Sequence, residues 1–201
     1  MTRMNRLRGV AVAAIAAVTN PLEVPDDLRD VQVLTRRHRR THRCGAVAYG
    51  EGSLPATLAA AVDARRIIEV GTALGYTAMS MARAVPAATV ETIELADEHV
   101  RIARAQIAAR GLAGRVIVRH GAAETILPAL DTAGYDLAFF DGFTPTVAVL
   151  REFHRLLRPG GVVVAGNLIL GPDPRATRYL ADTARWRTHS FGETALCVKI
   201  P

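Results

Sequence analysis

The chain has 201 residues, half of them hydrophobic, and carries a formal net charge of +6 with a sequence pI near 10.1. This length suits one domain with a full hydrophobic core, and no uninterrupted apolar run is long enough to cross a membrane. The excess charge lies near the N-terminus, because residues 1–43 contain nine arginines and only four acidic residues. We therefore expect a globular protein, with no membrane partner, in which a basic arm precedes the main domain.

The arm, residues 1–44, is predicted to be helical. Three arginines precede an apolar stretch at residues 9–18, which imitates a secretory signal peptide. The stretch is rich in alanine rather than leucine, so we favour an amphipathic or dimer-forming helix. After two prolines, a second helix is expected to begin near Asp26 and to carry leucine and valine side chains at helical spacing.

An arginine-rich run at residues 36–43 continues this second helix. Such a run can bind the phosphates of a nucleic acid. It contains no aromatic residue that could stack on bases, and a solvated helix face is the more common role. RNA contact therefore stays open as the less favoured role, and the two histidines of the run, His38 and His42, are expected to face solvent.

The two cysteines, Cys44 and Cys197, have neither the spacing of a metal site nor that of a redox pair. We expect both to be reduced core thiols of a cytoplasmic protein. His99, on a predicted helix, carries no functional signal.

The most informative stretch is residues 66–77. A short apolar strand at 66–70 is followed by a turn containing Gly71 and Gly75 and by a helix at 78–85. Glycine allows the sharp turn and lets a ligand approach the backbone closely. Glu69, near the end of an apolar strand, is unusual because a buried carboxylate needs hydrogen-bond donors or a cation.

A second strand, at residues 89–94, also ends in a carboxylate. Glu94 lies about twenty residues after the glycines, the spacing at which an acidic residue accepts both hydroxyls of a ribose. The alternative is that Glu94 supplies negative charge to the start of the next helix. Asp97 and Glu98 already serve that helix, so we favour the ribose role.

From residue 66 onward, strands and helices alternate. Strands are expected at residues 66–70, 89–94, 115–119, 135–141, 162–167, 187–191 and 194–200. Helices are expected at residues 56–62, 78–85, 97–110, 123–130, 144–157 and 174–184, with Pro-Gly-Gly at 159–161 closing the fifth of these. This pattern predicts an α/β domain at 45–201, with a doubly wound, mostly parallel seven-stranded sheet and a C-terminal antiparallel hairpin. Ligands bind at the carboxyl edge of such a sheet, where Glu69, Glu94 and Asp141 are all expected.

Several motifs together resemble a known family. They are Glu-Val-Gly-x-x-x-Gly-Tyr-Thr at 69–77, Glu94, Gly-Ala-Ala-Glu at 121–124, Phe-Phe-Asp at 139–141 and Leu-Arg-Pro-Gly-Gly at 157–161. In this order they resemble the class I S-adenosylmethionine-dependent methyltransferases, and more narrowly the cation-dependent O-methyltransferases of the catechol and caffeoyl-CoA type. The resemblance implies a Rossmann-like methyltransferase fold and S-adenosyl-L-methionine as cofactor.

The resemblance also implies a set of cofactor-binding residues: Val47, Glu69, Gly71, Thr72, Tyr76, Thr77, Glu94, Leu95, Ala123 and Asp141. Those of the first strand and its turn would surround the methionine part. Glu94 would bind the ribose, Leu95 and Ala123 would border the adenine, and Val47 would cover the cofactor. A rim of carboxylates suits a sulfonium cation better than it suits a pyrophosphate.

The metal site of that family is incomplete in this sequence. By the resemblance, Asp141 and Asn167 would bind a magnesium-type ion, but Gly166 stands where a second aspartate belongs. The lysine expected shortly after Asp141 is also absent, and residues 142–144 are Gly-Phe-Thr. Losing one of three protein ligands weakens the binding of a divalent ion, so metal dependence is doubtful. Asp141 remains a candidate catalytic residue, as a contact to the cofactor or as a general base.

The leading functional hypothesis is O-methylation of a small aromatic or natural-product hydroxyl. The alternatives are an RNA methyltransferase that uses the basic arm, and a cofactor-binding protein without catalytic activity. By likeness to the family, a homodimer formed through the N-terminal helices is expected.

Overall fold

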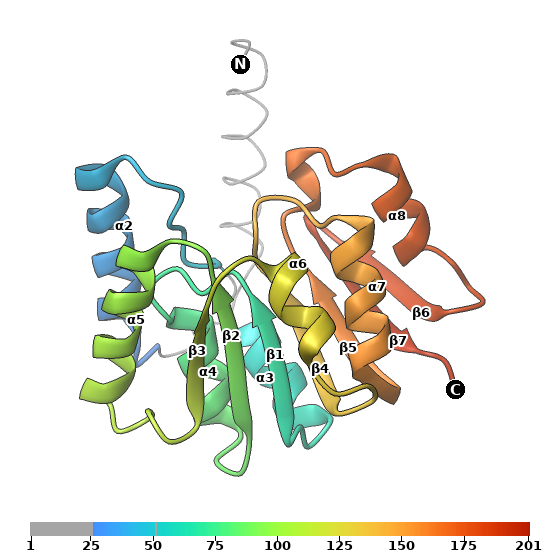
Figure 1. Cartoon of the computed structure of the whole chain (residues 1–201), viewed down its shortest axis with the longest axis horizontal. Helices are drawn as coiled ribbons and strands as arrows, with labels where there is room; N and C mark the ends of the chain where they lie inside the picture. Colours follow the sequence, from blue (N-terminus) through green and yellow to red (C-terminus); the bar gives the residue numbers. More distant parts are fainter. Residues whose placement is uncertain (1–25, 51) are drawn as a thin grey trace.

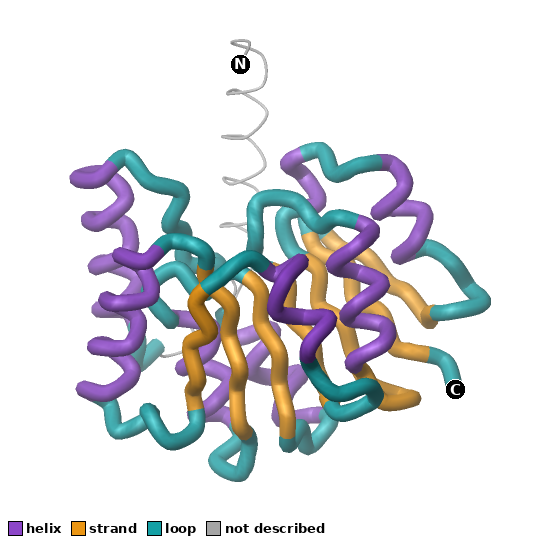
Figure 2. Tube along the Cα trace, viewed as in Figure 1, coloured by secondary structure: helices purple, strands orange, loops and turns teal. Residues whose placement is uncertain are grey.

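The structure of the protein, a computed structural model, describes residues 26–50 and 52–201 (Figure 1). The predicted helix at residues 9–18 lies outside them. A central seven-stranded sheet carries helices on both faces (Figure 2), which confirms the predicted fold class. Within the described ranges, no helix combines the length and the apolar character needed to cross a lipid bilayer.

The sheet has the strand order β3-β2-β1-β4-β5-β7-β6. The strands are β1 (Arg66–Val70), β2 (Thr89–Glu94), β3 (Val116–His120), β4 (Tyr135–Phe140), β5 (Leu157–Ala165), β6 (Trp186–Phe191) and β7 (Thr194–Lys199). The first five are parallel, and β7 is antiparallel to both β5 and β6, as the predicted hairpin requires. At the centre, Glu69 of β1 lies beside Thr92 of β2 and Phe139 of β4.

The helices pack on the two faces of the sheet. They are α2 (Arg29–His42), α3 (Ser53–Ala61), α4 (Tyr76–Ala84), α5 (Asp97–Ala109), α6 (Ala123–Ile126), α7 (Val147–Leu156) and α8 (Pro174–Leu180), with 3₁₀ turns η1 (Leu127–Ala129) and η2 (Leu168–Leu170). Successive strand residues point to opposite faces. Ile67 therefore packs in one core with α3, α4 and α5, whereas Ile68 packs in the other with α6, α7 and α8.

Helix α2 lies alongside α5 at one side of the molecule (Figure 1). Leu28 and Val31 are buried in the same core as α3 to α5, and Asp30 forms an ion pair with Arg110, just after the end of α5. The division into an arm, 1–44, and a domain, 45–201, stays a prediction, but residues 28 and 31 share the core of the domain.

The prediction for β5 is wrong at both ends. The strand begins at Leu157, so the Pro-Gly-Gly segment lies inside it, and the pairing jumps from Tyr135↔Leu157 to Leu137↔Val162. This irregularity accommodates a proline and two glycines that a regular strand would not hold. The strand ends at Ala165, and Asn167 has a left-handed backbone (φ 62°) that cannot continue it.

Three helix starts also differ from the prediction. Helix α3 begins at Ser53 rather than at residue 56. Helix α4 begins at Tyr76, two residues early, because Gly75 (φ 93°) supplies the left-handed turn before it. Helix α7 begins at Val147 rather than at 144, because the Thr146 side chain accepts a hydrogen bond from the Val149 N–H and caps the helix there.

Candidate functional site

A cavity of about 590 Å³ opens at the carboxyl ends of the parallel strands. It lies at the edge where doubly wound sheets bind their ligands. The structure brings seven of the predicted site residues together around it, from six separate segments of the chain: Val47, Gly71, Glu94, Leu95, Ala123, Asp141 and Asn167.

Gly71 shapes the floor of this cavity. Its backbone has φ 100°, and a Cβ atom at this position would lie 2.6 Å from the carbonyl oxygen of Asp141. The Asp141 N–H donates to the Val70 carbonyl at 2.8 Å, which holds the end of β4 against the turn. Only glycine fits between these two backbone segments, and the predicted close approach of a ligand at Gly71 stays a prediction.

Glu94 is fixed in the cavity wall by backbone donors. The Ala73 N–H donates to Oε2 at 2.8 Å and the Ala96 N–H donates to Oε1 at 2.9 Å. The carboxylate is thus oriented by the glycine turn on one side and by the start of α5 on the other. Each carboxylate oxygen can accept a further hydrogen bond, so Glu94 can still accept the hydroxyls of a ligand.

Glu69 does not line the cavity. Its side chain is fully buried and accepts hydrogen bonds from the hydroxyls of Thr77 and Thr92. Burial raises its pKa to about 7, although the two hydroxyl donors oppose the shift. Thr92, which the sequence analysis did not single out, also bonds to Thr72 at 2.6 Å.

Tyr76 is also turned away from the cavity. Its hydroxyl donates to Asp26 at 2.8 Å, beside α2, and its ring lies against Gly52. Glu69, Thr72 and Thr77, like Tyr76, are buried and are not among the residues that line the cavity. The predicted roles of these four residues in binding a cofactor stay predictions.

Asp141 and Asn167 lie together at the far wall. The Asn167 Nδ2 donates to the Gly142 carbonyl at 2.6 Å and to Asp141 Oδ1 at 3.3 Å. Burial, and then the nearby Glu69, raises the pKa of Asp141 well above its usual range. A carboxyl group of this kind is better matched to proton transfer near neutral pH than an ordinary aspartate.

These donors do not fit a magnesium-type ion, which needs several oxygen ligands. One carboxylate and one amide, already bonded to each other, are all that the pair supplies. A Cβ at Gly166 would lie 3.2 Å from the Phe140 carbonyl oxygen and 3.4 Å from the ring of Tyr49, so this side of the site is closely packed. The small number of oxygen donors and the close packing at Gly166 are therefore structural reasons to doubt that the protein depends on a magnesium-type ion.

Large apolar side chains surround the mouth of the cavity. Four of them are strongly exposed: Val47 (53%), Leu95 (70%), Phe143 (79%) and Leu170 (47%). Exposed apolar side chains that gather around a cavity are typical of a ligand site. They favour a ligand with flat, apolar surfaces.

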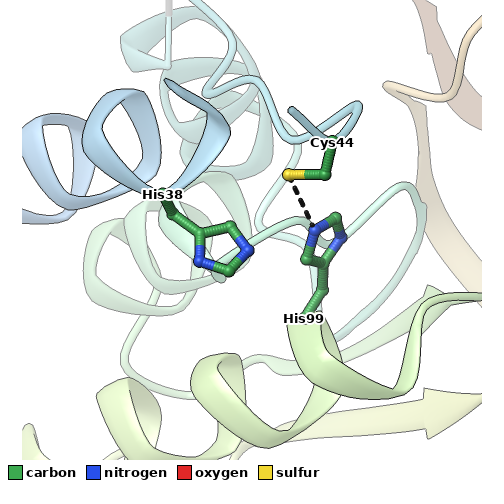
Figure 3. A group of neighbouring side chains, drawn as sticks. All are labelled: His38, Cys44 and His99. Carbon is green, nitrogen blue, oxygen red and sulfur yellow. Dashed lines mark hydrogen bonds between the residues drawn. The ribbon is translucent and has the colours of Figure 1, made fainter. Parts of the chain in front are cut away.

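A second cluster lies next to the wall formed by Glu94. His38, Cys44 and His99 point toward one another from α2, from the loop after it and from the first turn of α5 (Figure 3). The expectation that His38 faces solvent is wrong, because only 7% of it is exposed against α5. Burial, and then the neighbouring His42, lowers its pKa. Cys197 is a buried free thiol, as predicted, whereas Cys44 is only half-buried and lies 3.4 Å from His99 Nε2.

Comparison with known proteins identifies relatives of the chain. Residues 68–168, half of the chain, match the model of a family described as a methyltransferase domain. A catechol O-methyltransferase from Mycobacterium tuberculosis is 38% identical over 128 residues, which are 63% of this chain and 58% of that protein. A catechol O-methyltransferase from Niastella koreensis is 35% identical over 129 residues, which are 62% and 58%. The matched segment thus spans somewhat more than half the length of these relatives.

Solved structures of similar fold cover the chain more fully. The O-methyltransferase TomG from Streptomyces achromogenes, solved in complex with SAM, is 27% identical with a TM-score of 0.74 and covers 100% of both chains. An O-methyltransferase from Bacillus cereus, solved in complex with SAH, has a TM-score of 0.76 at 22% identity, covering 94% of this chain and 97% of its own. These findings confirm the resemblance drawn from the motifs.

Proposed function

Because the chain belongs to the family of methyltransferase domains, we propose that it is an S-adenosyl-L-methionine-dependent O-methyltransferase. The proposed acceptor is the hydroxyl group of a small aromatic or natural-product molecule. The single observation that carries the proposal is that two backbone N–H donors hold Glu94 at the cavity wall, where its carboxylate oxygens can accept further hydrogen bonds.

The cofactor would occupy the side of the cavity near β1 to β3. Glu94 would accept the ribose hydroxyls, and the exposed Leu95 together with Ala123 would enclose the adenine. Gly71 would let the methionine part pass over the turn. The carboxylates of Glu94 and Asp141 favour a cationic sulfonium electrostatically.

The acceptor would bind on the opposite side, near Asp141. Phe143 and Leu170 offer apolar contact for an aromatic ring, which supports a small aromatic acceptor over a polar one. In the reaction, the acceptor oxygen forms a bond to the methyl carbon while the carbon–sulfur bond breaks. The chain contributes by holding the two reactants close and collinear, and Asp141, in the ionised form, would take the hydroxyl proton.

Calorimetric binding of S-adenosylhomocysteine tests the proposal. We expect binding in EDTA, no change when magnesium is added, and a loss of about 30-fold or more in Glu94→Ala, since hydrogen bonds to a charged group contribute about 1.5–3 kcal/mol each. Glu98→Ala is the matched control, because Glu98 lies exposed on α5, four residues after Glu94, and forms an ion pair only with Arg101 among the described residues. Absence of binding by the wild type in both buffers would refute the methyltransferase proposal.

The other hypotheses predict different results. Cofactor binding without turnover on a panel of phenolic acceptors would favour a non-catalytic protein. Five arginines in the second half of α2 and at its C-cap are exposed and form no ion pair with a described residue: Arg36, Arg37, Arg39, Arg40 and Arg43. Salt-sensitive retention on RNA, lost when they are replaced, would favour an RNA substrate. A homodimer and a cytoplasmic location stay predictions.

A further inference from the structure

We propose that His38, Cys44 and His99 bind a transition-metal ion of the zinc type beside the cavity. One donor atom from each residue lies within 4.8 Å of the other two, and His99 Nε2 lies 3.4 Å from Cys44 Sγ. In a tetrahedral zinc site, with Zn–N near 2.0–2.1 Å and Zn–S near 2.3 Å, neighbouring donors are about 3.4–3.6 Å apart. Small side-chain adjustments therefore suffice to close the three donors around one ion.

The local fold brings these residues together. His38 continues the buried stripe of α2 formed by Val31 and Thr35, so its ring is directed at α5. Arg43 then takes a left-handed conformation (φ 50°), which ends the helix and turns Cys44 toward the first turn of α5, where His99 lies. The Asp30–Arg110 ion pair fixes the same two helices near their other ends. The cluster is thus held by the packing of α2 on α5.

The second nitrogen of His99 already has the partner that a metal-bound histidine needs. Its Nδ1 lies 3.5 Å from Glu94 Oε1, while Nε2 faces Cys44. Metal-bound histidines usually donate their other ring N–H to a carboxylate or carbonyl, which orients the ring and raises its basicity. Glu94 would be this outer-shell group. His42, stacked on His38 with ring centroids 4.4 Å apart, is one turn away and can supply a fourth donor; otherwise water does so.

The donor set selects the kind of ion. Two imidazoles and a thiolate favour zinc, cobalt or cadmium over magnesium, which prefers oxygen ligands. The site is therefore separate from the family's magnesium position at Asp141, and the proposal does not depend on methyl transfer. Bound metal would fasten α2 to α5 and hold Glu94 in place through His99.

Cobalt provides a direct test on the full chain after treatment with a chelator and dialysis. We expect one equivalent of Co²⁺ to bind, with a thiolate-to-cobalt charge-transfer band and the visible bands of a tetrahedral ion, and Zn²⁺ to displace it. Cys44→Ser should abolish the charge-transfer band, whereas Cys197→Ala, which removes the other thiol, should retain it. His99→Ala removes one of the proposed ligands, and His189→Ala, which removes a histidine outside the cluster, is its matched control.

Two further readouts separate binding from misfolding. Zinc should raise the melting temperature of the wild type but not that of Cys44→Ser, a conservative change at a half-buried position whose circular dichroism should be unaltered. Glu94→Gln should weaken metal binding by about 10–100-fold, as is typical of an outer-shell change. If the wild type takes up no cobalt, or if Cys44→Ser gives the same spectrum, the three residues are only packed together and the proposal is wrong.

Discussion

Replacing Glu69 by glutamine should make the protein more stable at alkaline pH. Glu69 is fully buried between two threonine hydroxyls, in register with Thr92, and no described cation pairs with it. Ionising it in this position costs free energy, which is why its pKa rises from 4.5 to about 7. Glutamine keeps the size and an acceptor oxygen but cannot ionise.

The size and sign of the effect follow from proton linkage. In the unfolded chain Glu69 loses its proton near pH 4.5, whereas the folded chain retains it up to about pH 7. The folded state therefore binds more protons between these values, and its stability falls as pH rises. At about 1.4 kcal/mol for each pH unit, the full effect is about 3 kcal/mol, of which about 2.5 kcal/mol appears between pH 5 and pH 8.

Urea unfolding from pH 5 to pH 8 measures this difference. The free energy of unfolding of Glu69→Gln, relative to wild type, should rise by that amount across the range. Glu91→Gln is the contrasting control: burial alone would raise the pKa of Glu91, but the Tyr135 hydroxyl and the Arg119 guanidinium lower it. The stabilisation that ionised Glu91 contributes is lost only at pH values below the pKa of Glu91 in the unfolded chain. From pH 5 to pH 8, Glu91→Gln should therefore be less stable than wild type by a constant amount, about 3–5 kcal/mol. If the free energies of unfolding of wild type and Glu69→Gln change with pH in parallel, the pKa of Glu69 is not raised by folding and the reasoning is refuted.

Three further substitutions test the site and its support. Gly71→Ala should cost more than about 2 kcal/mol, because its Cβ meets the Asp141 carbonyl, whereas Gly192→Ala, also at positive φ but in open space, should cost about 1–2 kcal/mol; equal losses in urea unfolding would contradict this. Asp141→Asn should lower turnover at least about 100-fold and remove the acid limb of the pH–rate profile, and an unchanged profile would exclude Asp141 as the base. Lys199→Met should cost about 1–3 kcal/mol, because its ammonium donates to two main-chain carbonyls at the C-terminal end of α7, with unchanged binding of S-adenosylhomocysteine.

The central strands could be predicted because their signals are local. Residues 66–70 form a short apolar run before a glycine turn, residues 89–94 end in a carboxylate, and both strands have the expected bounds. The start of β5 could not be predicted in this way. Pro-Gly-Gly usually ends an element, and only the pairing of Leu157 with Tyr135 across the sheet keeps that segment in a strand.

The residues of the candidate site differ in the same way, because some have a local signal in the sequence and others do not. Glu94 and Asp141 could be found because Glu94 ends β2 and Asp141 directly follows β4, both strands of the parallel sheet. The packing of Tyr49 against residue 166, and the meeting of His38 with His99, depend on how distant segments fold onto each other, and no spacing in the sequence indicates them. Glu69 has the expected position on its strand, but its burial follows from the threonines of neighbouring segments.

The order of the last two strands has a consequence for synthesis of the chain. β7 lies between β5 and β6, so the strand made earlier, β6, has no neighbour in the sheet until residues 194–199 have also left the ribosome. A nascent chain that ends at Phe191 exposes the unpaired edge of β5 and the apolar face that Trp186 would cover. Unpaired edges of this kind promote aggregation of unfinished chains. The seven-stranded sheet is thus completed only after β7 has been translated, and a ribosome stalled at the hairpin would leave the β5 edge exposed.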